Sequence, residues 1–357
     1  MRVRFIGQMP AQGYSGGRLA ALTQAEGLAM NGCTVDFLVD TIPEMAADFS
    51  TFSQVPLIQV DPSHLSAQVD HAIDVVIVVP STGLVSQHAE WARHAVECRA
   101  KLVLMNFETP NWFNAVSPYK RSPERWTGWN IVAEFADMVL SISGEGSRYA
   151  AQYFRQAPDY CQFDFVWPGI NTILADQAPA ATTRDKTIVL LSRADRHKGF
   201  DQLDPLLTPE LSEYKIIFIV GSVDTSLRRL ERLRQRLARF SIQLEVQQNL
   251  PTIEKFRLLK QASLLYFPSR FEGFGIPPLE AAYCYLPVAC SDLPVLREFG
   301  GAAFAYGDPT DVGNMRQAVL TALTMQDSVA AEHERMSDIA RIESYGAKTR
   351  VKLEGLF

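Results

Sequence analysis

Short apolar runs that alternate with longer amphipathic stretches constrain this chain more than any other feature of its sequence. Unbroken runs of Val, Ile, Leu and Phe are typical of strands buried on both faces, and such parallel strands are joined by helices. One series extends from RVRFIG at residue 2 to MVLSIS at residue 138, and a second from TIVLLSR at residue 187 to AAFAY at residue 302. The pattern predicts an α/β protein, and 357 residues suit two domains of ordinary size.

The stretch VWPGINTILADQAPAATTRDK at residues 166–186 separates the two series. Its Pro, Gly, Ala and Thr content predicts a linker rather than a helix or strand. Open α/β sheets bind ligands beyond the carboxyl ends of their strands. We therefore expect two Rossmann-like domains that face each other across a central cleft.

Charge and cysteine content exclude several classes of protein. The net charge of −6 argues against a nucleic-acid partner. The five cysteines are scattered without a CxxC pair, so neither a disulfide framework nor a zinc site is indicated. The sequence begins without a signal peptide, and no run is long enough to cross a bilayer. These features predict a cytoplasmic protein, with peripheral contact at the inner face of the membrane left open.

The segment PSRFEGFGIPPLEAA at residues 268–282 places two glutamates around a glycine-rich turn. Proline is tolerated at the start of a helix, so we expect a helix from about Pro277 with Glu280 in its first turn. Glu272 precedes the turn, and the two carboxylates would then reach one volume from two sides. The simpler alternatives are a solvated loop glutamate and a glutamate that only complements the helix dipole.

The turn itself is suited to bind a phosphate or a sugar hydroxyl. Glycine lets the backbone bend closely around a ligand, and backbone N–H groups ahead of a helix bind anions. The residues that would supply this geometry are Gly273, Phe274, Gly275 and Ile276.

Two further segments favour an anionic ligand. In LLSRADRHKGFDQL we expect a strand that ends at Arg193 and a helix that opens with Lys198. Cations near a helix start are unfavourable, so an anion such as a diphosphate would compensate them, although a solvated charge pair is the alternative. Gly16 and Gly17 follow the first strand and precede a helix, a turn that can bind phosphate.

Together these segments resemble the family 4 retaining glycosyltransferases of the GT-B fold, also called group 1. The motifs that carry the resemblance are the Gly16–Gly17 pair with EGLAMNGCTV downstream, PGIN, SRADRHKGFDQL, and the long block from ASLLYFPSRFEGFG to LPVLRE. This block contains an E-x7-E motif formed by Glu272 and Glu280. The resemblance extends over nearly the whole chain and is closest in the second half.

The resemblance implies a role for each matching residue. Glu280 would bind the ribose of a nucleotide-diphosphate sugar, and Glu272 the hydroxyls of the transferred sugar. Arg193 and Lys198 would hold the diphosphate with the backbone amides of Gly16, Phe274, Gly275 and Ile276. The nucleobase would lie against Asn249 and Leu250. No cofactor or metal is expected, because the two cations can neutralise the phosphates.

The resemblance also implies a domain organisation. Residues 1–168 would form the acceptor-binding domain and residues 169–335 the nucleotide-sugar-binding domain. Residues 336–357 would form a helix that crosses back to the first domain, with a break near Tyr345 and Gly346. The expected partners are a nucleotide-sugar donor and a carbohydrate or lipid-linked acceptor.

The chain departs from the family at one position. Many relatives carry a histidine after a strand of the first domain, where this sequence has NFETPNWF. Either Asn106 or Glu108 makes the contact to the donor sugar instead, or the acceptor geometry is unusual, and we favour Glu108 as a catalytic group. Trp112 belongs to a group of aromatic and basic residues suited to an acceptor, because aromatic rings bind sugar faces. A partly buried loop is the simpler interpretation.

Four other functions are less favoured. A sugar-nucleotide epimerase would need an acid pair that we do not find, and a phosphorylase would need a lysine suited to pyridoxal phosphate. A non-catalytic sugar-nucleotide or glycan-binding relative would explain the missing histidine but not the intact glutamates and cations. A dinucleotide-dependent dehydrogenase would need a GxGxxG motif, although Asp40 does end a predicted strand.

Overall fold

The protein is described by a computed structural model of residues 1–12, 15–62, 64–83, 85–181, 183–193, 195–200, 202–220 and 227–357. It divides into two compact units. The first comprises Met1–Ile170 with Arg341–Phe357, and the second comprises Asn171–Ala340. The sequence predicts domain boundaries after residues 168 and 335. None of the described helices has the length and apolar character that spanning a bilayer requires.

The first unit is built on a sheet of seven strands in the order β3-β2-β1-β4-β5-β6-β7. All of its pairings are parallel, as expected for buried apolar strands. Six strands match the predicted runs, whereas the edge strand β7 was not predicted because it is polar and half exposed. The strands are β1 Arg2–Gly7, β2 Thr34–Val39, β3 Leu57–Gln59, β4 Val75–Val79, β5 Lys101–Asn106, β6 Met138–Ser141 and β7 Gln162–Phe165.

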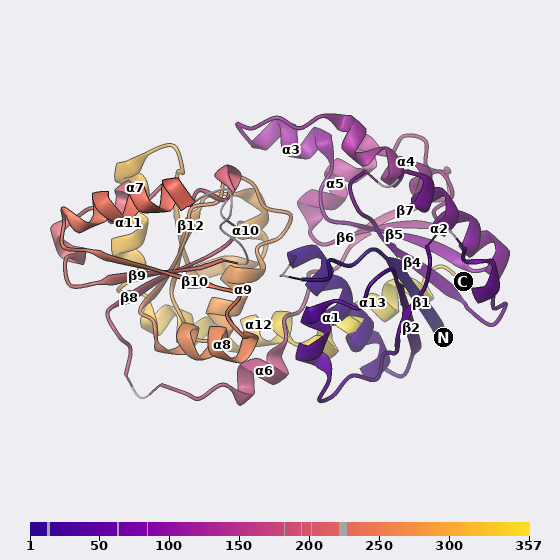
Figure 1. Cartoon of the computed structure of the whole chain (residues 1–357), viewed down its shortest axis with the longest axis horizontal. Coiled ribbons are helices and arrows are strands. Elements are labelled where there is room, and N and C mark those ends of the chain that lie inside the picture. The colour runs from indigo at the N-terminus through magenta and orange to yellow at the C-terminus, as the bar shows by residue number, and fades with distance from the viewer. Residues whose placement is uncertain are drawn as a thin grey trace. The chain divides into compact units, whose positions relative to one another are not determined.

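Helices cover both faces of this sheet (Figure 1). The face covered by α2 and α4 has a core in which Trp91, Trp126 and Trp129 pack on strand residues such as Val76 and Leu104. The opposite face carries α1 and α13 (Figure 1). The helices are α1 Gly16–Met30, α2 Val85–Cys98, α3 Pro110–Val116, α4 Thr127–Ala133, α5 Gly144–Tyr153 and α13 Ile342–Glu354.

Helix α13 joins the first unit although it comes from the end of the sequence. It packs along α1, and a Cβ on Gly346 would lie 2.0 Å from backbone atoms of Gly27. The predicted break near Tyr345 and Gly346 is therefore wrong, because this glycine allows close helix packing and the helix continues through it. The chain bends at Arg341 instead, which has an extended backbone.

The second unit contains a parallel sheet of six strands in the order β10-β9-β8-β11-β12-β13. All six were predicted from the sequence. Figure 1 shows α7 and α11 on one face of this sheet and α8, α9 and α12 on the other. The strands are β8 Thr187–Leu191, β9 Lys215–Val220, β10 Gln243–Gln248, β11 Leu264–Phe267, β12 Val288–Ser291 and β13 Phe304–Gly307. The helices are α6 Thr172–Gln177, α7 Leu227–Ala238, α8 Thr252–Gln261, α9 Ile276–Tyr283, α10 Pro294–Gly300, α11 Val312–Ala322 and α12 Gln326–Ala340.

The expected linker at residues 166–186 is only partly irregular. It contains α6, whose N-cap Asn171 accepts a hydrogen bond from the Leu174 amide. The Tyr283 hydroxyl donates to Asp176 at 2.6 Å, and Lys260 donates to the carbonyl of Ala178 at 2.7 Å. These contacts fix the segment to the second unit, so the prediction of a linker was wrong for α6.

Candidate functional site

The sheet of the second unit has a topological switch point between β8 and β11. These strands are neighbours in the sheet, but the chain leaves β8 toward β9 on one side and β11 toward β12 on the other. Segments that leave two such strands diverge and leave a crevice at their carboxyl ends, where open α/β sheets bind ligands. Two of the sequence motifs with predicted ligand contacts, SRADRHKGFDQL and the E-x7-E block, follow these two strands.

An ion pair joins the two segments at this point. Lys198 Nζ lies 2.8 Å from both Oε1 and Oε2 of Glu272. Lys198 follows β8 in the chain and Glu272 follows β11. The Glu272 side chain is 8% exposed and that of Lys198 is 18% exposed. The structure therefore brings together two of the predicted site residues, as partners of each other.

The backbone around Lys198 differs from the prediction. Arg196–Lys198 form a single 3-10 turn, and Gly199 ends it in the left-handed region with φ 68°. A Cβ on Gly199 would lie 2.0 Å from the Pro268 carbonyl oxygen, so the turn packs tightly on the residue after β11. Lys198 thus closes a turn and does not open a helix. The argument that a helix start disfavours this lysine was wrong.

Arg193 is not part of this ion pair. Its side chain is 62% exposed and lies 3.4 Å from Asp195. The strand ends at Leu191, two residues before the predicted end. The structure gives Arg193 and Lys198 separate carboxylate partners, and a joint contact with a diphosphate stays a prediction.

The glycine-rich turn leads into α9 as expected. Gly275 is the N-cap with φ 119°, and a Cβ there would lie 2.5 Å from Leu296. Phe274 is buried and stacks on Phe299 at a centroid distance of 4.3 Å. Because residues 277 and 278 are prolines, Ile276 alone supplies an N–H among the first three residues of the helix.

Glu280 is the fifth residue of α9 and not part of its first turn, which corrects the prediction. Its Oε1 accepts a hydrogen bond from Lys255 Nζ at 2.5 Å, and the two side chains are 3% and 12% exposed. Besides its place in the helix, the carboxylate has a largely buried cationic partner from α8.

Lys255 is the partner of Glu280, and the sequence analysis does not name it. A periodic signal for it is nevertheless present in the sequence. Thr252, Phe256 and Leu259 form the buried stripe of α8, and Lys255 has the spacing of that stripe. A charged lysine on the buried face of a helix is costly in free energy unless an anion lies next to it.

The predicted nucleobase loop follows β10. Asn249 has a left-handed backbone with φ 49°, and its amide donates to the carbonyl of Val220 at 3.0 Å. This bond ties the loop to the end of β9, at the same carboxyl edge of the sheet. Leu250 is half-buried next to it. Contact with a base stays a prediction.

The remaining predicted residues lie in the first unit. Gly16 begins α1, and a Cβ on Gly17 would meet the Phe107 ring at 3.3 Å. Asn106 ends β5 fully buried, and its Nδ2 donates to Ser141 Oγ at 2.9 Å. Glu108 accepts a hydrogen bond from Arg121 at 2.6 Å, and both side chains are about one-fifth exposed.

The aromatic residues near the predicted acceptor region belong to the core. Trp112 is 2% exposed and stacks on Tyr149 at 5.8 Å. Trp126 and Trp129 are buried as well. An aromatic platform for a sugar needs an open ring face, and these residues do not present one. The sequence could not separate the two roles, because large aromatics occur in both.

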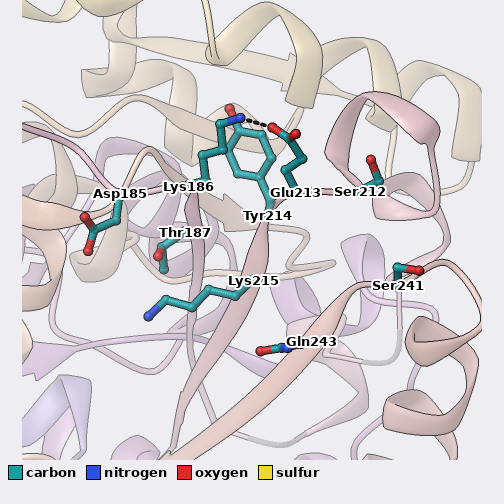
Figure 2. Close-up of a pocket in the computed structure, with 9 residues that line it drawn as sticks. All are labelled: Asp185, Lys186, Thr187, Ser212, Glu213, Tyr214, Lys215, Ser241 and Gln243. Carbon is teal, nitrogen blue, oxygen red and sulfur yellow. Dashed lines mark hydrogen bonds and ion pairs between the residues drawn. The ribbon is translucent and has the colours of Figure 1, made fainter.

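A polar pocket of about 390 Å³ lies at the other end of the second sheet (Figure 2). Two acids and two lysines are among its lining residues, and Lys186 pairs with Glu213. The balanced charge gives it no preference for a diphosphate. The lining residues are Asp185, Lys186, Thr187, Ser212, Glu213, Tyr214, Lys215, Ser241 and Gln243, which precede or begin β8, β9 and β10.

A model of a known protein family matches most of the second unit. Residues 174–342 match the family model described as glycosyl transferases group 1. These residues form a group 1 domain. It contains the Lys198–Glu272 and Lys255–Glu280 pairs.

Curated relatives of parts of this chain are named as mannosyltransferases. The serotype-specific mannosyltransferase WbdA of Escherichia coli is 31% identical over 213 residues, or 55% of this chain and 26% of WbdA. The O-antigen chain mannosyltransferase RfbU of Salmonella typhimurium is 28% identical over 123 residues, or 33% of each protein. The chain thus spans about a quarter to a third of these two relatives.

Solved structures resemble the whole chain. HepE of Anabaena, solved with UDP and glucose, has a TM-score of 0.74 at 15% identity and covers 99% of this chain and 100% of its own. Sucrose-phosphate synthase from Thermosynechococcus elongatus has a TM-score of 0.74 at 17% identity and covers 100% of this chain and 99% of its own. These likenesses confirm the predicted fold class, with two Rossmann-like domains of the GT-B type.

Proposed function

We propose that the protein is a retaining, metal-independent glycosyltransferase that moves a hexose from a nucleotide-diphosphate sugar to a glycan, lipid-linked or small-molecule acceptor. The Lys198–Glu272 pair at the switch point of the group 1 domain carries this proposal. Because the curated relatives are named as mannosyltransferases, mannose is the first donor sugar to test.

The two ion pairs have different tasks in this reaction. Glu280 accepts hydrogen bonds from the ribose hydroxyls, and Lys255 holds its carboxylate in place. Glu272 accepts hydrogen bonds from hydroxyls of the transferred sugar. Lys198 contacts the diphosphate as the bond to the sugar breaks. Its positive charge stabilises the negative charge that develops on the leaving diphosphate. Arg193, which is exposed, closes on the same phosphates.

The transfer is a front-face displacement. The acceptor oxygen forms a bond to the anomeric carbon while the bond from that carbon to the diphosphate oxygen breaks. The acceptor proton goes to a phosphate oxygen of the leaving group, so no side chain forms a covalent intermediate. The configuration at the anomeric carbon is retained because the new bond forms on the face that the diphosphate leaves.

The donor must compete with the ion pair in the resting protein. Both Glu272 oxygens contact Lys198, so a bound diphosphate has to draw this ammonium group from the carboxylate. The carboxylate then becomes available to sugar hydroxyls. A complete donor can satisfy both partners at once, whereas a nucleoside diphosphate satisfies only Lys198.

Donor turnover tests the proposal directly. The protein is incubated with UDP- and GDP-linked mannose and glucose, with and without EDTA, and release of the nucleoside diphosphate is measured together with the sugar products by NMR. We expect release from one donor, unaffected by EDTA, and an axial donor linkage that stays axial in the product. Loss of turnover in EDTA that magnesium restores would refute metal independence. An epimerised sugar would support the epimerase alternative, and binding without turnover would support a non-catalytic relative.

A further inference from the structure

The first sheet has its own topological switch point, between β1 and β4. One side chain bridges it. Arg18 of α1 donates from Nε to the carbonyl of Gln8, after β1, at 2.8 Å, and from Nη2 to the hydroxyl of Ser81, after β4. The guanidinium therefore lies where a doubly wound sheet offers a ligand crevice.

The charge of Arg18 has no carboxylate partner within ion-pair distance among the residues that the structure describes. A guanidinium has five N–H donors, and described residues engage two of them, both through neutral oxygens. Asp40 is the acid whose charge acts on it. Burial is the stronger influence and lowers the pKa of Arg18 to about 10.

Two other arginines, of which Arg4 is buried and Arg184 is half-buried, have structural roles in this protein. Arg4 contacts both oxygens of Asp36 and the carbonyl of Gln68. Arg184 donates to five carbonyl oxygens and needs no carboxylate. Arg18 has neither a carboxylate nor a full set of carbonyls, and it is half-buried, so a ligand can reach it.

The position of Arg18 in the helix is unfavourable without an anion. It is the third residue of α1, where the helix dipole favours negative charge. Two neighbouring features fit a phosphate-bearing sugar substrate. Gly17 packs on Phe107, which brings the start of α1 to the end of β5. There Asn106 is fully buried, and its Oδ1 has no hydrogen-bond partner among the described residues. An amide oxygen of this kind accepts a hydroxyl.

We propose that Arg18 binds a phosphate group of a substrate at the β1–β4 switch point. The inference rests on the proposed function for the source of that phosphate, which is either the diphosphate of the donor or a phosphate carried by the acceptor. A charge-assisted guanidinium–phosphate contact uses the free donors and neutralises the partly buried cation.

Three variants test the proposal, all in the full chain. Arg18→Met removes the charge, Arg18→Lys keeps it, and Arg93→Met is the control, because Arg93 is an exposed helical arginine of the same unit that pairs with Glu90. Calorimetric titration measures the binding of a nucleoside diphosphate, of inorganic phosphate and of a short-chain prenyl phosphate. Thermal unfolding is measured for each variant.

Arg18→Met is expected to weaken the binding of one of these probes about tenfold or more. The affinity of Arg18→Lys should be closer to that of the wild type, and the affinity of Arg93→Met should be unchanged. A loss limited to the nucleoside diphosphate identifies the donor as the source. A loss for the prenyl phosphate, with or without inorganic phosphate, identifies the acceptor. Unchanged affinity for all three probes overturns the proposal.

Stability separates a ligand site from a structural role. Removal of an uncompensated cation from a helix start is expected to leave the melting temperature of Arg18→Met unchanged or raised. A lowered melting temperature with unchanged phosphate binding would mean that Arg18 is structural. Lys198→Met distinguishes the two proposals: if it leaves nucleoside diphosphate binding intact while Arg18→Met abolishes prenyl phosphate binding, the Arg18 site stands and the assigned donor site falls.

Discussion

Lys255 Nζ lies 2.5 Å from Glu280 Oε1 in the second unit, where the Glu280 side chain is 3% exposed and the Lys255 side chain is 12% exposed. A buried ion pair contributes little net stability, but removal of one partner leaves an uncompensated buried charge. The carboxylate that is proposed to bind ribose is therefore also needed for the stability of the fold, because its removal leaves Lys255 without a partner.

We expect Glu280→Gln to lower the free energy of unfolding by about 3 to 5 kcal/mol and to weaken donor binding. The double variant Lys255→Met with Glu280→Leu should recover most of the stability without recovering the binding. Urea unfolding and donor titration, both on the same samples, measure these effects. Full donor affinity in the stable double variant would contradict the ribose role of Glu280.

The Lys198–Glu272 pair leads to opposite expectations for its two members. Lys198→Met should weaken nucleoside diphosphate binding about 10- to 100-fold, because a charge-assisted contact is lost. Glu272→Gln should leave that binding equal or tighter, because it frees the ammonium group, while it lowers turnover of the complete donor. Titration of each variant with the nucleoside diphosphate and with the complete donor distinguishes the effect of Lys198→Met from that of Glu272→Gln. Equal losses in both variants would argue against competition for Lys198.

Gly199 holds Lys198 at the end of its turn. Gly199→Ala should cost about 1 to 2 kcal/mol for the left-handed backbone and about 1 to 3 kcal/mol more for contact with Pro268. Gly83→Ala is a matched control, because Gly83 also has a positive φ of 97° but nothing lies within 4 Å of its Cβ position. Chemical unfolding of both variants measures the difference. Equal costs would show that the Pro268 contact is relieved without penalty.

The surroundings of His94 predict that the fold loses stability in acid. Burial, followed by the charge of Arg4, lowers the pKa of His94, whose Nε2 lies 3.3 Å from an Arg4 nitrogen and 3.5 Å from the Cys98 sulfur. The unfolded histidine takes up a proton below about pH 6.5, whereas the folded one resists it until a lower pH. The free energy of unfolding should therefore fall as the pH drops below about 6.5. Unfolding curves of wild type and His94→Gln between about pH 7 and pH 5 test this, and parallel losses in both would assign the effect to other groups.

The sequence predicts the two sheets well because buried parallel strands have an unmistakable apolar pattern. Its failures concern polar segments. Strand β7 is half exposed and α6 is short, so neither has enough periodicity to be recognised. The Gly346 position was misjudged for another reason: a glycine within a helix is a break by local preference, but here it allows α1 to approach.

The candidate site was predicted in part. Its carboxylates and Lys198 were found because glycines and prolines mark the turn that contains them. Their partners could not be assigned, because an ion pair between segments 74 residues apart depends on strand order, which local pattern does not give. Lys255 had a usable signal in the stripe of α8, whereas Arg18 is distinguished only by the oxygens around it.

The return of α13 to the first unit affects how the chain matures during synthesis. The second unit is continuous, so all of its residues leave the ribosome before residues 341–357. The first unit is begun earliest and completed last, with the face of α1 that receives α13 uncovered in the meantime. During that interval Gly27 lacks the close backbone packing of Gly346, and Gln24 lacks its hydrogen bond to Thr349.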